Sequence, residues 1–171
     1  ETPVLSANSG QYNPTGASWV FAGTQTGTAF VVNDGTAIRR SGWGWTNPLA
    51  QPQEGLQNAI LRNSNSTITQ TFNAPAGTYK IRFYAGRSTV GSAADVIVKI
   101  NGVTVYTVAA ASLPVGGTQS MFETGAVNIA TGGSQTVTFT SNVSTTNYQL
   151  DNVSIIVLAS GAFTFNPSPA T

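Results

Sequence analysis

The residues best suited to contact a ligand are two tryptophans separated by a single glycine, Trp43 and Trp45. In an extended strand, positions two apart place their side chains on the same face. Arg39 and Arg40 precede them and supply hydrogen-bond donors beside an apolar surface, which is the usual composition of a ligand site. The pattern predicts a platform on which a sugar ring stacks. The alternative is that the indole rings fill space beneath a long loop, since tryptophan is usually well buried.

A second candidate is a polar strand face. Along one predicted strand, Tyr79, Ile81 and Phe83 point to the core, whereas Lys80, Arg82 and Tyr84 share the opposite face. On what we expect to be a neighbouring strand, Asp95 and Lys99 occupy matching alternate positions. Together they could form a concave polar face that holds a glycan. The alternative is a solvated outer face with cross-strand charge pairs of little energetic weight.

Arg87 is a third candidate, because it follows the end of the same predicted strand. Binding residues concentrate on loops that a rigid scaffold holds in place. We therefore expect Arg87 to contribute to a ligand-binding loop cluster, or alternatively to bond the carbonyls of its own loop.

Catalysis is not expected. The sequence has neither Cys nor His, which removes the thiolate nucleophile, the imidazole base and the common zinc sites. A glycosidase needs two carboxyl groups across a cleft, and the acidic residues show no paired motif. These acids are Glu1, Asp34, Glu54, Asp95, Glu123 and Asp151. We predict that the chain is not an enzyme.

Composition also restricts the partners. Charged residues make up 8% of the chain and the net charge is +1, so no basic stripe can neutralise a run of phosphates. Nucleic acid is therefore excluded as an expected partner, and no apolar run is long enough to span a membrane. Thr, Ser, Asn, Gln and Gly fill the polar positions, a composition that we associate with secreted or cell-surface bacterial proteins.

Alternation of apolar and polar residues, bounded by Gly, Pro, Asn or Ser, predicts an all-β protein. Asn101-Gly102 predicts a type I′ hairpin turn, because both positions favour positive φ. The spacing of the strands indicates a two-sheet antiparallel β-sandwich. The expected strands span 19–21, 29–32, 66–72, 78–84, 95–100, 103–106, 121–129, 135–140 and 149–158.

We expect a single domain over residues 1–160 and an extended tail or linker over residues 161–171. The tail contains two prolines after Phe165 and shows no continuing strand pattern there. Phe163-Thr164-Phe165 does alternate as a donated strand would.

Several stretches in order along the chain also match a known family. They are Glu1-Thr2-Pro3, Tyr12-Asn13-Pro14-Thr15-Gly16-Ala17-Ser18-Trp19, Ser66-Thr67-Ile68-Thr69-Gln70-Thr71-Phe72, Ala76-Gly77-Thr78-Tyr79-Lys80-Ile81-Arg82-Phe83 and Asp151-Asn152-Val153-Ser154-Ile155. In these the chain resembles the galactose-binding-like jelly-roll domains of bacterial extracellular proteins and is similar to carbohydrate-binding modules. The resemblance implies an antiparallel sandwich of eight or nine strands that binds a sugar at loops on one edge or on a concave sheet face.

The resemblance also implies that one structural Ca²⁺ is often present. Glu1 matches the family's acidic position at the N-terminus, and Asp151 opens the last strong strand. Together with backbone carbonyls, these carboxylates could bind calcium, which accepts mixed oxygen ligands. The alternative for Asp151 is a structural role in capping a turn through backbone hydrogen bonds.

Two functional hypotheses follow. The first is a non-catalytic carbohydrate-binding or adhesion module that recognises a polysaccharide or cell-surface glycan and is joined to neighbouring domains. The second is a structural subunit of a surface layer, extracellular fibre or phage particle that assembles through its termini by strand addition.

Overall fold

A computed structural model describes residues 4–6, 10–12, 14, 16–23, 35–40, 52–62, 66–89, 91–142 and 146–158. For residue 12 and residues 35–40 only the backbone is described. Glu1, Trp43, Trp45, the predicted strand 29–32 and the tail 161–171 lie outside the described residues. The predictions that concern them therefore remain predictions.

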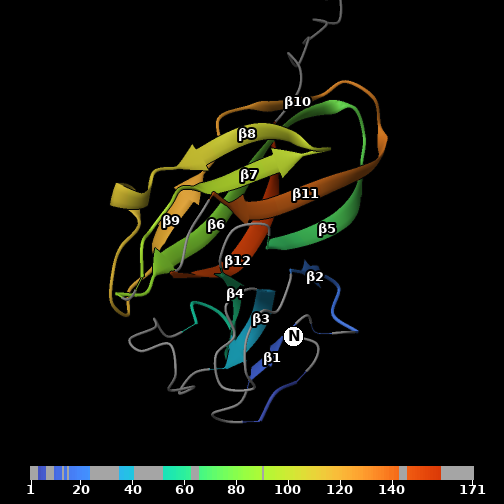
Figure 1. The fold of residues 1–171 in the computed structure, drawn as a ribbon. Coiled ribbons are helices and arrows are strands. Elements are labelled where there is room, and N and C mark those ends of the chain that lie inside the picture. Colours follow the sequence, from blue (N-terminus) through green and yellow to red (C-terminus); the bar gives the residue numbers. More distant parts are fainter. Residues whose placement is uncertain are drawn as a thin grey trace, which may run out of the picture.

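The described chain forms two antiparallel sheets (Figure 1). In spatial order, the seven-stranded sheet consists of β1 (Gly10–Tyr12), β3 (Gly35–Arg40), β4 (Gln57–Arg62), β12 (Asn147–Leu158), β6 (Gly77–Arg87) and β10 (Val127–Ile129), with β9 (Ser120–Glu123) also paired to β6. The five-stranded sheet consists of β2 (Val20–Ala22), β5 (Thr67–Ala74), β11 (Gly133–Ser141), β7 (Val96–Ile100) and β8 (Val103–Val108). A short 3₁₀ helix spans Ala110–Ser112. The predicted all-β, two-sheet antiparallel sandwich is confirmed.

The core lies between the inner faces of the two sheets. Alternation along β6 buries Tyr79, Ile81 and Phe83, as the sequence predicts. The ring of Phe83 meets that of Phe139 on β11 edge to face, with centroids 5.1 Å apart. The aromatic pair therefore joins one sheet to the other.

The predicted Asn101-Gly102 turn is confirmed. Asn101 and Gly102 have φ angles of 49° and 80°, and they connect β7 to β8. Positive φ at both central positions is what a type I′ turn requires.

The expected strand 121–129 is divided into β9 and β10. Thr124 lies at the break, and its hydroxyl accepts a hydrogen bond from the Ile81 amide at 3.0 Å. The Thr124 amide in turn donates to the Ile81 carbonyl. Because the threonine side chain occupies the Ile81 amide of β6, the regular ladder stops there and resumes at Val127. The structure also contains three strands that the sequence pattern did not predict, β1, β3 and β4. Together with the break, they raise the number of strands in the described residues above the expected eight or nine.

The expected polar face shared by Lys80, Arg82, Asp95 and Lys99 is wrong. β6 belongs to the seven-stranded sheet, whereas β7 pairs with β11 and β8 in the other sheet. β6 ends at Arg87 in one sheet and β7 begins at Val96 in the other, so these two strands are consecutive in the chain but are not neighbours. The partner of the β6 cations is instead Glu123 on β9, which bonds Lys80 and Arg82 at 2.7 Å each.

This ion-pair cluster gives a testable pH dependence. Hydrogen bonds from Lys80, and then from Arg82, hold the pKa of Glu123 below its ordinary value of 4.5. A depressed carboxyl pKa stabilises the fold above the unfolded-state value, and that stabilisation is lost as the pH falls through the folded-state value. Thermal unfolding of Glu123→Gln and of the parent chain should therefore differ at neutral pH and converge below pH 4.5. The difference in melting temperature at neutral pH should be small, since the ion pairs are partly exposed to solvent. A difference that grows as the pH falls would contradict the stabilising role of the Glu123 carboxylate.

Gly86 on β6 lies beneath the segment that leads into β9. A Cβ at this position would come within 2.1 Å of the backbone oxygen of Thr118. Gly86→Ala should therefore destabilise the fold by about 1–3 kcal/mol, the cost of overpacking. Gly125→Ala is the matched control, because a Cβ there meets nothing within 4 Å. Urea unfolding of both variants measures the difference in stability. Equal urea midpoints would contradict the close approach of the Thr118 backbone to β6.

Among the described residues, no helix is long and apolar enough to cross a membrane.

Candidate functional site

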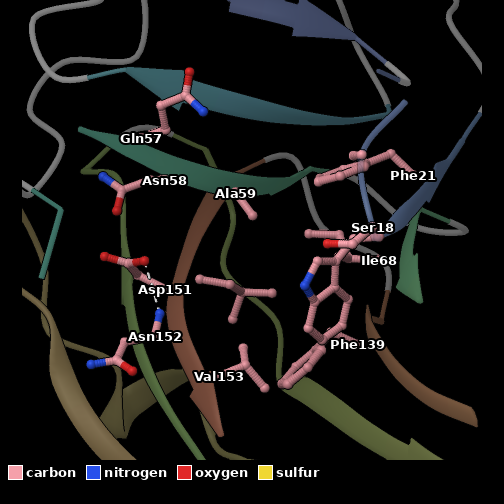
Figure 2. A pocket seen from close by; sticks show the side chains of 13 residues that line it. Ser18, Phe21, Gln57, Asn58, Ala59, Ile68, Phe139, Asp151, Asn152 and Val153 are labelled. Atoms are coloured by element: carbon pink, nitrogen blue, oxygen red, sulfur yellow. Dashed lines mark hydrogen bonds between the residues drawn. The ribbon is translucent and has the colours of Figure 1, made fainter. Parts of the chain in front are cut away.

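A cleft of about 280 Å³ opens between the two sheets (Figure 2). One side comes from β2, β5 and β11 of the five-stranded sheet, and the other from β4 and β12 of the seven-stranded sheet. The lining residues are Ala17, Ser18, Trp19, Phe21, Gln57, Asn58, Ala59, Ile68, Phe139, Leu150, Asp151, Asn152 and Val153.

The wall from the five-stranded sheet is largely apolar. Trp19 is half-buried, and its ring lies 6.1 Å from that of Phe139 in a tilted arrangement. Phe21 and Ile68 are buried beside them. Because Trp19 packs against a ring that is itself fixed in the core, this aromatic surface is pre-positioned for a ligand.

The upper part of the opposite wall carries two amides on β4. Asn58 is 1% exposed, and its Oδ1 accepts a hydrogen bond from Nε2 of Gln119 at 3.3 Å. The Oε1 of Gln57 accepts a hydrogen bond from the Leu5 amide at 2.7 Å. These bonds fix both amide groups at the edge of the cleft.

A β-bulge in β12 shapes the rest of this wall. The register with β6 shifts between Asp151 and Ser154. Asn152 within the bulge has a φ of 45°, a left-handed conformation that asparagine tolerates better than most residues. Its side chain is exposed, and Figure 2 shows Asp151 and Asn152 across the hollow from Ser18 and Phe139. The bulge therefore places polar groups opposite the apolar wall.

The Asp151 carboxylate ties two segments together. Its Oδ2 accepts hydrogen bonds from the amides of Gln53 at 2.6 Å and Glu54 at 3.2 Å. Its Oδ1 accepts one from the Asn152 amide at 2.8 Å. This arrangement supports the alternative in which Asp151 caps a turn through backbone bonds. Among the described residues no group of three or more acidic side chains could hold a metal ion, and Glu1 lies outside them, so the calcium site stays a prediction.

Removing this carboxylate should loosen the 53–54 segment. We expect Asp151→Ala to cost about 1–3 kcal/mol, because three backbone donors lose a charged acceptor. Amide hydrogen exchange at Gln53 and Glu54 should accelerate in the variant. Asp95→Ala is the control, since Asp95 bonds the distant Ala110 amide and its loss should leave exchange at 53–54 unchanged. Equal exchange at 53–54 in all three proteins would contradict the role assigned to Asp151.

The structure brings several predicted residues near the cleft. Tyr84 is half-buried and lies directly opposite Asp151 in the β6–β12 register. The backbones of Arg39 and Arg40 pair with those of Asn58 and Gln57, which line the cleft.

Two other predicted residues, Arg82 and Arg87, make their contacts away from the cleft. Arg82 donates to Glu123 through Nε at 3.0 Å and Nη2 at 2.7 Å. Arg87 ends β6, where its amide donates to the Pro114 carbonyl and its carbonyl accepts from Gly116. The Nε of Arg87 is buried and has no hydrogen-bond partner among the described residues. Neither arginine lines the cleft.

Sequence reasoning missed Trp19, Asn58 and Asn152 as site residues. The sequence carries no clear signal for the bulge. In the structure, Tyr148 and Leu150 belong to the core before it, and Val153 and Ile155 pack against the core after it. Side chains in a regular strand alternate strictly, but Ile156 and Leu158 are apolar as well, so the change of phase cannot be read from the sequence.

No family model matches the sequence, and no curated protein matches it. Solved structures with the same fold do exist. A cyclase from Fischerella sp. TAU in complex with 4-(1H-indol-3-yl)butan-2-one is 11% identical, with a TM-score of 0.66 over 94% of both chains. The carbohydrate-binding module TmCBM61 in complex with β-1,4-galactotriose is 13% identical, with a TM-score of 0.55 over 82% of this chain and 88% of that one.

A third structure is the enzymatically active domain of tailspike protein 4 from bacteriophage CBA120. It is 14% identical, with a TM-score of 0.51 over 83% of this chain and 20% of that one. At these identities the likeness concerns the fold, which serves both enzymes and binding modules, so the expected absence of catalysis stays a prediction. The chain has the galactose-binding-like jelly-roll fold of carbohydrate-binding modules.

Proposed function

We propose that the chain is a non-catalytic, extracellular module that binds carbohydrate in the cleft between Trp19 and the Asp151–Asn152 bulge. The observation that carries the proposal is an aromatic wall that lies across the cleft from the β12 bulge, where the Asn152 side chain is exposed. The face of an indole ring is electron-rich, which attracts the polarised C–H groups of a sugar ring. The exposed amide of Asn152 and the exposed hydroxyl of Ser18 can donate and accept hydrogen bonds with sugar hydroxyl groups.

The dimensions of the cleft suit a small part of a glycan. Ligand pockets commonly have volumes of about 300–1,000 Å³, and this cleft, at about 280 Å³, lies at the lower limit. It therefore suits one or two sugar units, such as the end of a chain or a side branch. The rest of a polysaccharide would extend over the surface.

Trp43 and Trp45 belong to the same proposed site. Arg40 is paired with Gln57, a lining residue of the cleft. Trp43 follows Arg40 by three positions, so its Cα lies within about 11 Å of that of Arg40. We expect the two indoles to extend the aromatic surface beyond the mouth of the cleft, with Arg39 and Arg40 supplying further polar contacts.

The fold adds support at a coarser level. TmCBM61, which has the same fold, was solved with a galactose trisaccharide bound. A secreted or cell-surface location fits a module of this kind. One structural calcium ion, with Glu1 and Asp151 among its ligands, belongs to the proposal as well.

Isothermal titration calorimetry of the chain with a panel of neutral oligosaccharides, with and without calcium, tests the proposal. The panel includes β-1,4-galactotriose, xylotriose and cellotriose. We expect saturable binding of at least one of them. Absence of binding to every oligosaccharide, in both conditions, would overturn the proposal.

The cyclases favour a second candidate, an enzyme that acts on an indole-containing substrate. The cyclase solved with 4-(1H-indol-3-yl)butan-2-one matches 94% of the chain with a TM-score of 0.66. A cleft lined by Trp19, Phe21 and Phe139 also suits a flat aromatic ligand. Titration with 4-(1H-indol-3-yl)butan-2-one in the same calorimeter separates the candidates. Binding of the ketone without any binding of sugars would favour the second.

A further inference from the structure

A separate groove of about 540 Å³ lies between the outermost strands of the two sheets, β8 and β10. Figure 1 shows these two strands along the same edge of the sandwich. Val103 on β8 is 67% exposed, and Val105 and Val127 are partly exposed. The groove shares no lining residue with the cleft. It is therefore a second, largely aliphatic concave surface.

Two of the three side-chain amides that line the groove, those of Asn101 and Gln135, are hydrogen-bonded within the protein. Nδ2 of Asn101 donates to Oε1 of Gln135 at 2.6 Å, and Oδ1 of Asn101 accepts from the Thr136 amide at 2.9 Å. Nε2 of Gln135 donates to the Thr131 carbonyl at 3.1 Å. None of the described residues that line the groove is aromatic, so they offer a sugar ring no stacking surface. These features suit apolar side chains better than a carbohydrate.

The sequence after β12 contains such side chains. β12 ends at Leu158, which pairs with Thr78, and Thr78 pairs on its other side with Asn128 of β10. The chain therefore leaves the last strand at the end of the sandwich where the groove lies. Phe163 and Phe165 follow within seven positions, and in an extended segment both rings share one face.

The groove of the same molecule is hard for this segment to reach. To reach β8 in the other sheet, the segment would first pass β6 and β10, two strand spacings or about 10 Å from β12, and then cross the roughly 10 Å between the sheets. The five steps from Leu158 to Phe163 span at most about 17 Å when fully extended, which is shorter than this path. A segment from another molecule is free of this restriction.

We propose that the groove between β8 and β10 receives Phe163 and Phe165 of a second copy of this chain. The segment lies along the free edge of β8 and extends the five-stranded sheet, with both rings against Val103 and Val105. The net charge of +1 opposes such self-association only weakly. Because the donated segment and the groove are different surfaces, the contact is head-to-tail and generates chains of molecules.

Sedimentation equilibrium over a wide concentration range tests the proposal. The parent chain should show mass that rises with concentration beyond a dimer. Three changes should each yield monomers: deletion of residues 159–171, the double substitution Phe163→Ser with Phe165→Ser, and Val103→Asp in the groove. Val20→Asp is the matched control, because Val20 is 64% exposed on the outermost strand β2, and it should assemble like the parent.

A mixing experiment gives the sharpest outcome. The deletion variant keeps an intact groove, and Val103→Asp keeps an intact tail, so the two monomeric variants should form a one-to-one complex when mixed. A parent chain that stays monomeric at every concentration overturns the proposal. So does self-association that persists in both variants, or a failure of the two variants to bind each other.

Discussion

Replacing Trp19 with alanine is expected to weaken carbohydrate binding roughly thirtyfold or more, the effect of losing a buried aromatic contact of about 2 kcal/mol. Trp19 is a partly exposed residue of the apolar wall of the cleft, and its ring packs against the buried ring of Phe139. Without the indole, a sugar ring would lose its stacking surface while the hydroxyl partners stayed in place. Calorimetric titration with the best oligosaccharide measures the loss.

Two controls make the Trp19 result specific. Trp19→Phe keeps a flat ring and should bind with intermediate affinity. Met121→Ala changes a residue that is 49% exposed on β9, outside the cleft, and should bind like the parent. An unchanged affinity in Trp19→Ala, with the fold intact, would place the binding site elsewhere.

Replacing Phe139 with alanine is expected to cost about 3–5 kcal/mol of unfolding free energy, the usual range for a buried aromatic residue. Phe139 is fully buried and contacts both Phe83 across the sandwich and Trp19 at the cleft. At about 2–4 °C per kcal/mol for a domain of this size, the melting temperature should fall by about 10 °C. Differential scanning calorimetry provides the measurement.

The control for Phe139→Ala is a substitution of the neighbouring residue on β11, Thr138. Thr138 is partly exposed, and its hydroxyl shares a hydrogen bond with Thr69 at 3.1 Å. Thr138→Ala should cost about 1 kcal/mol or less, the usual net value of such a bond. If both substitutions had equally small effects, the core could not depend on the aromatic contact between the sheets.

Local patterns in the sequence were sufficient to predict most of the framework. Alternation identified the buried face of β6 at Tyr79, Ile81 and Phe83, and Asn101-Gly102 fixed a hairpin because its φ requirement is local. Which strands become neighbours is a non-local property. The pairing of β6 with β12 and β9, instead of with β7, depends on crossings between sheets that no local pattern records.

The candidate site shows the same division. Tyr84 and Asp151 were each singled out by type, but their pairing across β6 and β12 follows from a register set over distant segments. Trp19 was assigned only to a strand, because its contact with Phe139 joins positions far apart in the sequence. The bulge at Asn152, which forms part of one wall of the cleft, could not be located from the sequence, because apolar residues occupy both odd and even positions in β12 after Asp151.

The most direct test of carbohydrate binding in the cleft is chemical-shift mapping of the isotopically labelled chain during titration with the oligosaccharide that binds best. If the sugar binds in the cleft, the largest shifts should fall on the indole of Trp19, on Asn58 and on the Asp151–Asn152 bulge. Smaller shifts should appear at the indoles of Trp43 and Trp45. Shifts confined to the groove between β8 and β10, or to Trp43 and Trp45 without the cleft residues, would contradict binding in the cleft.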